Sequence, residues 1–168
     1  MASWRAMIAD DIPQVAQVAD QIHPNLPEGD FVFSERIRLF PEGCLILSQG
    51  SRVLGYAVSH PIRHAQPPAL DSLLGEIPTD ADQYYIHDVA ILPELRGQGH
   101  ATEGIRKLLD VGSRFASTCL VSVYGTGPFW RRFGFREEEV EDALREKLRN
   151  YGDDAVFMSR RNDASPQN

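Results

Sequence analysis

The chain has few cysteines and no long apolar run, and both absences narrow what it can be. Its two cysteines, Cys44 and Cys119, lie inside apolar stretches, where buried reduced thiols are expected rather than a disulfide. No uninterrupted apolar run approaches the roughly 18 residues of a membrane-spanning helix, and residues 1–11 lack the apolar core of a secretory signal. We therefore expect a cytoplasmic protein without a membrane partner.

The chain also has fewer positively charged than negatively charged residues. The 17 Lys and Arg residues face 24 Asp and Glu residues, for a formal net charge of −7. This balance opposes broad attraction to nucleic acid and favours a cationic partner. No metal site is expected either, because Pro61 prevents a continuous helix across His60 and His64, which have the four-residue spacing of helical metal ligands.

Short predicted strands and helices alternate along the chain. The 168 residues suit one domain, which we place at residues 1–160, with 161–168 as a disordered tail. Apolar spacing predicts strands at 4–8, 44–48, 53–59, 84–92, 120–124 and 155–159, and helices at 12–22, 33–40, 101–112, 128–134 and 140–151. Residues 61–82 are predicted as a long loop beside the active site, with a short helix near 70–74.

A glycine-rich turn joins the strand at 84–92 to the helix that follows. Arg96-Gly97-Gln98-Gly99-His100-Ala101 would offer unpaired backbone N–H groups, a helix dipole and a permanent cation to a phosphate. A P-loop would need Gly-Lys-Ser/Thr, and a dinucleotide fingerprint would need glycine at Thr102. The turn therefore suits a pyrophosphate, although such junctions are often only tight connections.

Two segments resemble known sequences. The stretch from His87 to Ala101 resembles motif A of the GNAT superfamily of N-acetyltransferases, and Thr126 to Phe135 is similar to that family's later aromatic-pair and Gly-Phe segment. The resemblance implies an α/β (α+β) fold, with a mixed, mostly antiparallel sheet of six to seven strands flanked by about four helices. It also implies that acetyl-CoA is the co-substrate.

The same resemblance implies how the coenzyme binds. Backbone groups of the strand before the turn would hold the pantetheine arm and face the thioester carbonyl, often where a bulge splays the strand. The turn would hold the phosphates, mostly through main-chain N–H groups. The expected coenzyme residues are Val89, Ala90, Ile91, Arg96, Gly97, Gln98, Gly99, His100, Ala101, Thr102, Phe129 and Trp130.

Direct attack on the thioester requires a neutral amine, and an alkyl ammonium has a pKa of about 10.4. His87 and Asp88 are the nearest titratable groups, but neighbours in a strand point to opposite faces, so one of them is expected to serve. We favour Asp88 acting through water, with His87 as the alternative; both can equally be structural.

Trp130 stands where many family members have a tyrosine that protonates the thiolate. Indole cannot be that acid, so Trp130 is interpreted as a packing wall and Tyr124 as a substitute donor.

Taken together, the sequence predicts acetyl transfer from acetyl-CoA to a primary amine, in a ternary complex and without a metal. A small-molecule acceptor is favoured, and the resemblance makes a homodimer plausible. The alternatives are a peptide or protein N-acetyltransferase, an acyl-CoA-binding regulator with weak catalysis, and a nucleotide-binding module without acyl chemistry.

Overall fold

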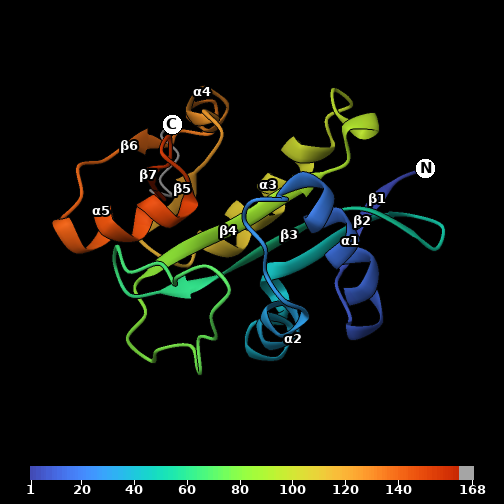
Figure 1. Ribbon diagram of the computed structural model, residues 1–168, viewed down its shortest axis with the longest axis horizontal. Coiled ribbons are helices and arrows are strands. Elements are labelled where there is room, and N and C mark those ends of the chain that lie inside the picture. Colours follow the sequence, from blue (N-terminus) through green and yellow to red (C-terminus); the bar gives the residue numbers. More distant parts are fainter. Residues whose placement is uncertain (163–168) are drawn as a thin grey trace.

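The computed structural model describes residues 1–162, which form one seven-stranded sheet (Figure 1). The strands lie in the order β1-β2-β3-β4-β5-β7-β6, and each neighbouring pair is antiparallel except β4 and β5. Their bounds are β1 Ser3–Ala6, β2 Cys44–Gln49, β3 Arg52–Ile62, β4 Gln83–Ile91, β5 Ser117–Ser122, β6 Arg136–Glu137 and β7 Val156–Arg161. The expected mixed, mostly antiparallel sheet is confirmed.

Within residues 1–162, five α-helices accompany the sheet: α1 Ile12–Ile22, α2 Asp30–Leu39, α3 His100–Gly112, α4 Gly127–Arg131 and α5 Asp142–Leu148. Gly112 of α3 contacts Tyr84, whereas Leu144 and Leu148 of α5 join the core cluster of Tyr85. Because neighbouring strand residues point to opposite faces, α3 and α5 cover opposite faces of β4. None of the helices in residues 1–162 is long and apolar enough to cross a membrane.

The sheet opens between its two parallel strands. Pairing of β4 with β5 covers only Tyr84–Ile86 and Thr118–Leu120, yet β4 continues to Ile91 and β5 to Ser122. The edge of β4 that faces β5 is therefore left without a strand partner over its last residues. Such an opening can accept an extended ligand by backbone hydrogen bonds.

A bulge lies just before this opening. Val58 pairs with Asp88 and Ser59 with Ile86, so His87 is an extra residue in β4. A bulge interrupts the alternation of side chains along a strand. The expectation that His87 and Asp88 point to opposite faces is therefore wrong at this site, because the bulge places both residues opposite Val58.

Several expected bounds differ from the structure. No helix forms at residues 70–74, because the side chains of Glu28 and Glu35 take the backbone N–H groups of Asp71, Leu74 and Gly75. The strand expected at 120–124 runs from Ser117 to Ser122, and Tyr124 follows it with a left-handed φ of 57°. The short β6 was not predicted.

The end of the chain also differs from the sequence-based prediction. Strand β7 includes Arg161, and Asn162 donates to Gly112 O, Phe115 O and Thr118 Oγ1. The ordered domain therefore extends past residue 160, and the rest of the predicted tail, residues 163–168, lies outside the described residues. Cys44 and Cys119 are buried free thiols, as expected.

Gly43 is a point where the fold depends on the absence of a side chain. A Cβ on this residue would lie 2.0 Å from the backbone oxygen of Ser59, and backbone cannot rotate away as a side chain does. We expect Gly43→Ala to lower the free energy of unfolding by about 3 kcal/mol, measured by urea denaturation.

Gly50→Ala is the control, because Gly50 has a φ of 61° and open space around it. Backbone strain alone should cost about 1 kcal/mol there. Equal losses in the two variants would mean that the approach of Gly43 to Ser59 is not as tight as described.

Candidate active site

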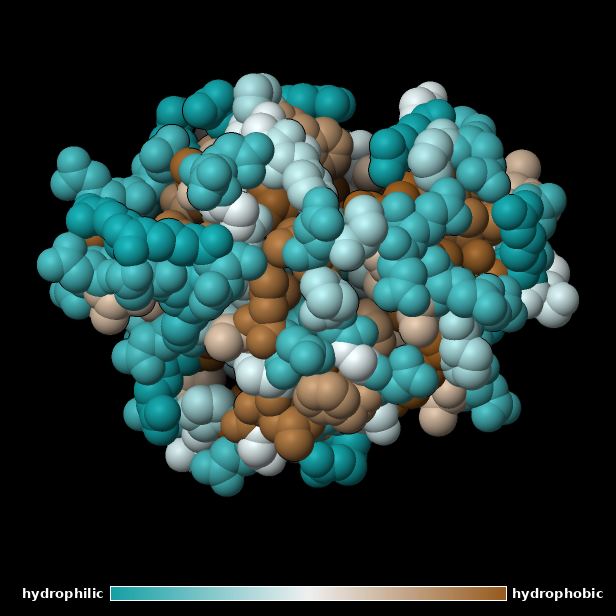
Figure 2. All heavy atoms as spheres, in the orientation of Figure 1, coloured by the Kyte–Doolittle hydropathy of each residue, from teal (hydrophilic) through white to brown (hydrophobic). Residues whose placement is uncertain are grey.

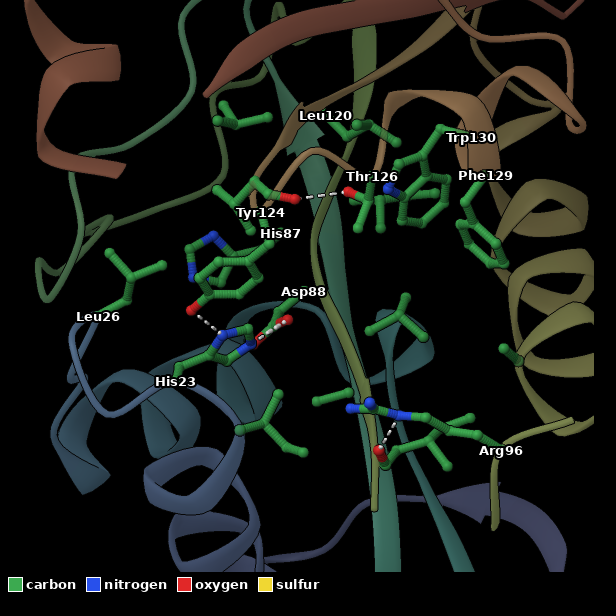
Figure 3. A pocket seen from close by; sticks show the side chains of 18 of the residues that line it. His23, Leu26, His87, Asp88, Arg96, Leu120, Tyr124, Thr126, Phe129 and Trp130 are labelled. Atoms are coloured by element: carbon green, nitrogen blue, oxygen red, sulfur yellow. Dashed lines mark hydrogen bonds and ion pairs between the residues drawn. The ribbon is translucent and has the colours of Figure 1, made fainter. Parts of the chain in front are cut away.

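One cavity of about 710 Å³ collects the residues singled out in the sequence. It lies along β4, between the segment that follows α1, the end of β5 and the first turns of α3 and α4 (Figure 3). Of the expected site residues it is lined by His87, Asp88, Val89, Ala90, Ile91, Arg96, Gly97, Gly99, His100, Ala101, Thr102, Tyr124, Phe129 and Trp130. Gln98 does not line it, and its side-chain amide bonds to Glu94 O at 3.3 Å.

The turn before α3 forms one end of the cavity. Gly97 and Gly99 have φ values of 80° and 84°, and a Cβ on either would meet no atom within 4 Å. The space beside the first turn of α3 is therefore open to a ligand atom at both glycines. Arg96 lies next to it and donates its Nε–H to Ile91 O at 3.3 Å. Together the open backbone, the helix N-terminus and the guanidinium fit a pyrophosphate.

A series of four hydrogen-bonded side chains begins in the middle of the cavity, and three of them, Tyr124, His23 and Asp88, are labelled in Figure 3. Asp88 Oδ1 lies 2.9 Å from His23 Nε2, and Asp88 Oδ2 accepts from the Tyr56 hydroxyl at 2.5 Å. His23 Nδ1 lies 2.8 Å from the Tyr124 hydroxyl, and the His23 and Tyr124 rings stack. This chain joins the segment after α1, β3, β4 and the segment after β5.

This series of hydrogen-bonded side chains is partly shielded from solvent at its Asp88 end and open to solvent at Tyr124. The side chains of His23 and Asp88 are 12% and 17% exposed, whereas Tyr124 is 51% exposed. Tyr124 is therefore the member that a bound substrate can reach most readily.

The charges around this chain shift two of its protonation equilibria. Burial lowers the pKa of His23, but the hydrogen bond and charge of Asp88 and the charge of Glu28 outweigh it, so the pKa lies above the ordinary 6.5. Burial, Asp88 and Asp154 raise the pKa of Tyr124. Tyr124 is thus a hydroxyl near neutral pH, and His23 is poised to exchange a proton there.

A second histidine–carboxylate pair lies in the same cavity. His87 Nε2 lies 2.7 Å from Glu28 Oε1, and His87 Nδ1 lies 3.2 Å from the Tyr85 hydroxyl. Burial raises the pKa of Glu28, but the charge and hydrogen bond of His87, the backbone N–H of Asp71 and the charge of Arg36 outweigh it, so the net pKa is lowered. His87 and Asp88 therefore belong to two separate networks.

Trp130 packs against other aromatic side chains at the edge of the cavity. Its ring meets those of Phe129 and Phe135 edge to face at centroid distances of 5.2 and 5.6 Å, and the residue is 9% exposed. This placement is that of an apolar wall.

Three residues of the site were not singled out individually from the sequence: His23, Glu28 and Tyr56. Each meets its partner only through the fold, because His23 and Asp88 are 65 positions apart and Tyr56 and Asp88 are 32 apart. Among residues 1–162, no group of three or more His, Cys, Asp or Glu side chains is arranged to hold a metal ion.

A splayed parallel strand pair that leads to a glycine-rich helix N-terminus defines a site for a nucleotide-linked acyl carrier. The chain matches the model of the Acetyltransferase (GNAT) family over residues 9–135 and belongs to that family. It is accordingly an acetyl-CoA-dependent N-acetyltransferase.

Solved structures share the fold. The loading GNATL domain of CurA from Lyngbya majuscula is 16% identical, with 96% of this chain and 98% of that chain covered and a TM-score of 0.77. Arabidopsis thaliana Naa50, in complex with the bisubstrate analogue CoA-Ac-MVNAL, is 14% identical, with coverages of 95% and 97% and a TM-score of 0.70.

The ribosomal-protein-S18-alanine N-acetyltransferase from Escherichia coli is 14% identical, with coverages of 100% and 98% and a TM-score of 0.65. No curated protein matches the sequence. At these identities the similarity shows the fold, and the acceptor has to be argued from the residues of the cavity.

Proposed function

We propose that this protein acetylates a small primary amine, and that Tyr124, His23 and Asp88 carry the proton that the amine must lose. The observation that carries the proposal is the unbroken hydrogen-bonded chain from the half-exposed Tyr124 hydroxyl through His23 to the half-buried Asp88. Acetyl-CoA supplies the thioester when it is bound. The side chains of Tyr124, His23 and Asp88 transfer the proton and orient the amine.

Proton removal follows the direction of the hydrogen bonds. Asp88 accepts the Nε2–H of His23, so the neutral ring presents its bare Nδ1 to the Tyr124 hydroxyl. The ammonium of the acceptor gives one proton to the Tyr124 oxygen while Tyr124 passes its own to His23 Nδ1. The amine nitrogen is then neutral and bonds to the thioester carbon.

The same chain can return the proton. When the carbon–sulfur bond breaks, the departing thiolate takes the proton of Tyr124, and His23 restores it from Nδ1. The attacking nitrogen loses its second proton to solvent as the amide forms. A thiolate is a tolerable leaving group because its conjugate acid has a pKa near 8.5. Trp130 cannot donate this proton. Tyr124 therefore acts as the substitute donor that the sequence analysis expected.

The position of the thioester is supported by the free edge of β4. Val89, Ala90 and Ile91 pair with β3 on one side and have no strand partner toward β5. Their outward backbone groups can bind the pantetheine arm and place its thioester beside Asp88 and Tyr124.

The test is thiol release from acetyl-CoA by the purified protein, with monoamines, diamines, amino acids, aminoglycosides and short peptides as acceptors. Release that depends on a small amine and is lost in Arg96→Glu supports the proposal. Release with peptides alone would assign a peptide acceptor, and coenzyme binding without release would indicate a regulator.

Tyr124→Phe removes the hydroxyl and keeps the ring that stacks on His23. We expect kcat to fall by about 10²-fold with the affinity for coenzyme unchanged, measured by steady-state thiol release and calorimetry. An unchanged kcat would exclude Tyr124 from proton transfer.

A further inference from the structure

The loop between β3 and β4, residues 63–82, reaches the cavity through Leu70. Leu70 is half-buried and lines the cavity together with Leu26 and Glu28 of the segment between α1 and α2. Residues 63–82 contain no helix or strand. The position of Leu70 therefore depends on hydrogen bonds between this loop and its neighbours.

Two of these hydrogen bonds hold the backbone on either side of Leu70. Tyr151 donates its hydroxyl to Pro68 O at 2.9 Å, and Asp71 N donates to Glu28 Oε2 at 3.0 Å. Tyr151 and Glu28 themselves line the cavity. Both contacts therefore belong to the wall that they hold in place.

The same stretch of the loop is held by two further contacts. Lys147 donates to Pro67 O at 2.7 Å, and Asp71 Oδ1 accepts from Gly29 N at 2.8 Å. The four hydrogen bonds tie residues 67–71 to α5 and the segment after it on one side, and to the segment between α1 and α2 on the other. Mobile loops have few such contacts, so Leu70 is part of a fixed wall.

Glu28 links this wall to the strand that carries Asp88. Its Oε1 lies 2.7 Å from His87 Nε2, while its Oε2 accepts from Asp71 N. One carboxylate therefore spans the space between the β4 bulge and the loop residue next to Leu70. An acceptor that reacts beside Asp88 has only a short depth before it meets the loop.

The side chains at the loop end of the cavity are mostly apolar. Leu26 and Leu70 line it, and the hydroxyl of Tyr151 is bonded to Pro68 O, which leaves the ring for a ligand. The side chain of Glu28 is only 8% exposed. Figure 2 likewise shows apolar side chains gathered through the middle of an otherwise hydrophilic face. A polar group here would lose its water and find few partners, so this end suits an apolar acceptor body.

From this wall and the contacts that hold it, we infer that Leu70 determines specificity by limiting the length of the acceptor, a primary amine with a short apolar body. Tyr151 is a positioning residue, because it acts by holding the backbone beside Leu70. The inference rests on the proposed function for the acetyl step and adds an upper limit on acceptor size.

The experiment follows primary alkylamines from propylamine to decylamine. Each added methylene should raise the kcat/KM of the wild-type protein about fourfold until the alkyl chain reaches Leu70. The next methylene should lower it by at least about tenfold. Leu70→Ala opens space at that point, so the longest amine that is accepted well should gain about two methylenes.

Leu73→Ala is the matched control for this substitution. Leu73 lies in the same loop, but it is 61% exposed and does not line the cavity. The length limit of this variant should equal that of the wild-type protein. An equal shift of the limit in Leu70→Ala and Leu73→Ala would overturn the role of Leu70.

Tyr151→Phe tests the positioning role. It keeps the ring that lines the cavity and removes the donor to Pro68 O, so the wall should yield to longer amines. The drop beyond the length limit should shrink to about threefold, and the change should appear in KM rather than in kcat. An unchanged drop would show that Tyr151 does not position Leu70.

Calorimetry separates this inference from the proposed function. Affinities of the same amines for the protein saturated with coenzyme A should show the same length limit, and the same shift in Leu70→Ala, even if no amine is acetylated. Acetylation with a limit that Leu70→Ala does not move would support the proposed function and overturn the inference. The absence of a limit in the wild-type protein, or of affinity for any alkylamine, would overturn it as well.

Discussion

Asp88→Asn should reduce kcat/KM by about 10³-fold while the affinity for acetyl-CoA stays within about twofold. In the wild-type protein both oxygens of Asp88 accept, one from His23 and one from Tyr56. An asparagine has one acceptor and one donor group, so one of these two partners is left unmatched. If the amide donates to His23 Nε2, the ring proton moves to Nδ1, and His23 can no longer accept from Tyr124.

The pH dependence gives a second, independent readout of the same variant. His23 accepts a proton only when neutral, so wild-type kcat/KM should rise with pH as His23 loses its proton, above the ordinary pKa of 6.5. Removing the charge of Asp88 lowers the pKa of His23. In Asp88→Asn, kcat/KM should therefore begin to rise at a lower pH than in the wild-type protein, and its plateau value should be much lower.

The control is the double variant Asp88→Asn with His23→Gln. When two residues act as one unit, replacing either one removes the contribution of both. The double variant should therefore be about as slow as either single variant. Multiplicative losses would show that Asp88 and His23 act separately.

Gly99→Val should weaken acetyl-CoA binding by at least about 100-fold. Gly99 has a φ of 84°, and a Cβ there would meet no protein atom within 4 Å. In the free protein the substitution therefore costs only backbone strain. In the complex the valine side chain fills the space beside the helix N-terminus that the phosphates need. Isothermal titration calorimetry with coenzyme A measures the loss.

Gly50→Val is the matched control for this prediction. Gly50 also has a left-handed φ, of 61°, with open space around it, but it lies in the β2–β3 turn away from the cavity. Both variants should lose similar thermal stability, and only Gly99→Val should lose coenzyme binding. Equal coenzyme affinity in the two variants would contradict phosphate binding at the turn.

The residues expected to bind the coenzyme could be singled out from the sequence because they are contiguous. Arg96, Gly97 and Gly99 follow a strand and precede a helix, and the reason for each residue type is local. Gln98 lies within that run without lining the cavity, and its side-chain amide donates to Glu94 O. A contiguous pattern identifies a turn without fixing the direction of every side chain in it.

The acceptor half could not be predicted in the same way. His23 follows α1 directly and carries no local sign that it will meet Asp88, which is 65 positions later. The alternation rule also failed at His87, because a bulge depends on the pairing of β3 with β4 rather than on the sequence of β4 alone. Likewise, the loop after β3 is shaped by the distant carboxylates Glu28 and Glu35.

The most direct test of the account is a single-turnover reaction of the purified protein with acetyl-CoA and hexylamine, with both products identified by mass spectrometry. The account predicts equal amounts of N-acetylhexylamine and free coenzyme A from the wild-type protein, formed about 10³-fold more slowly by Asp88→Asn. Coenzyme A released without acetylated amine, or an unchanged rate in Asp88→Asn, would contradict it.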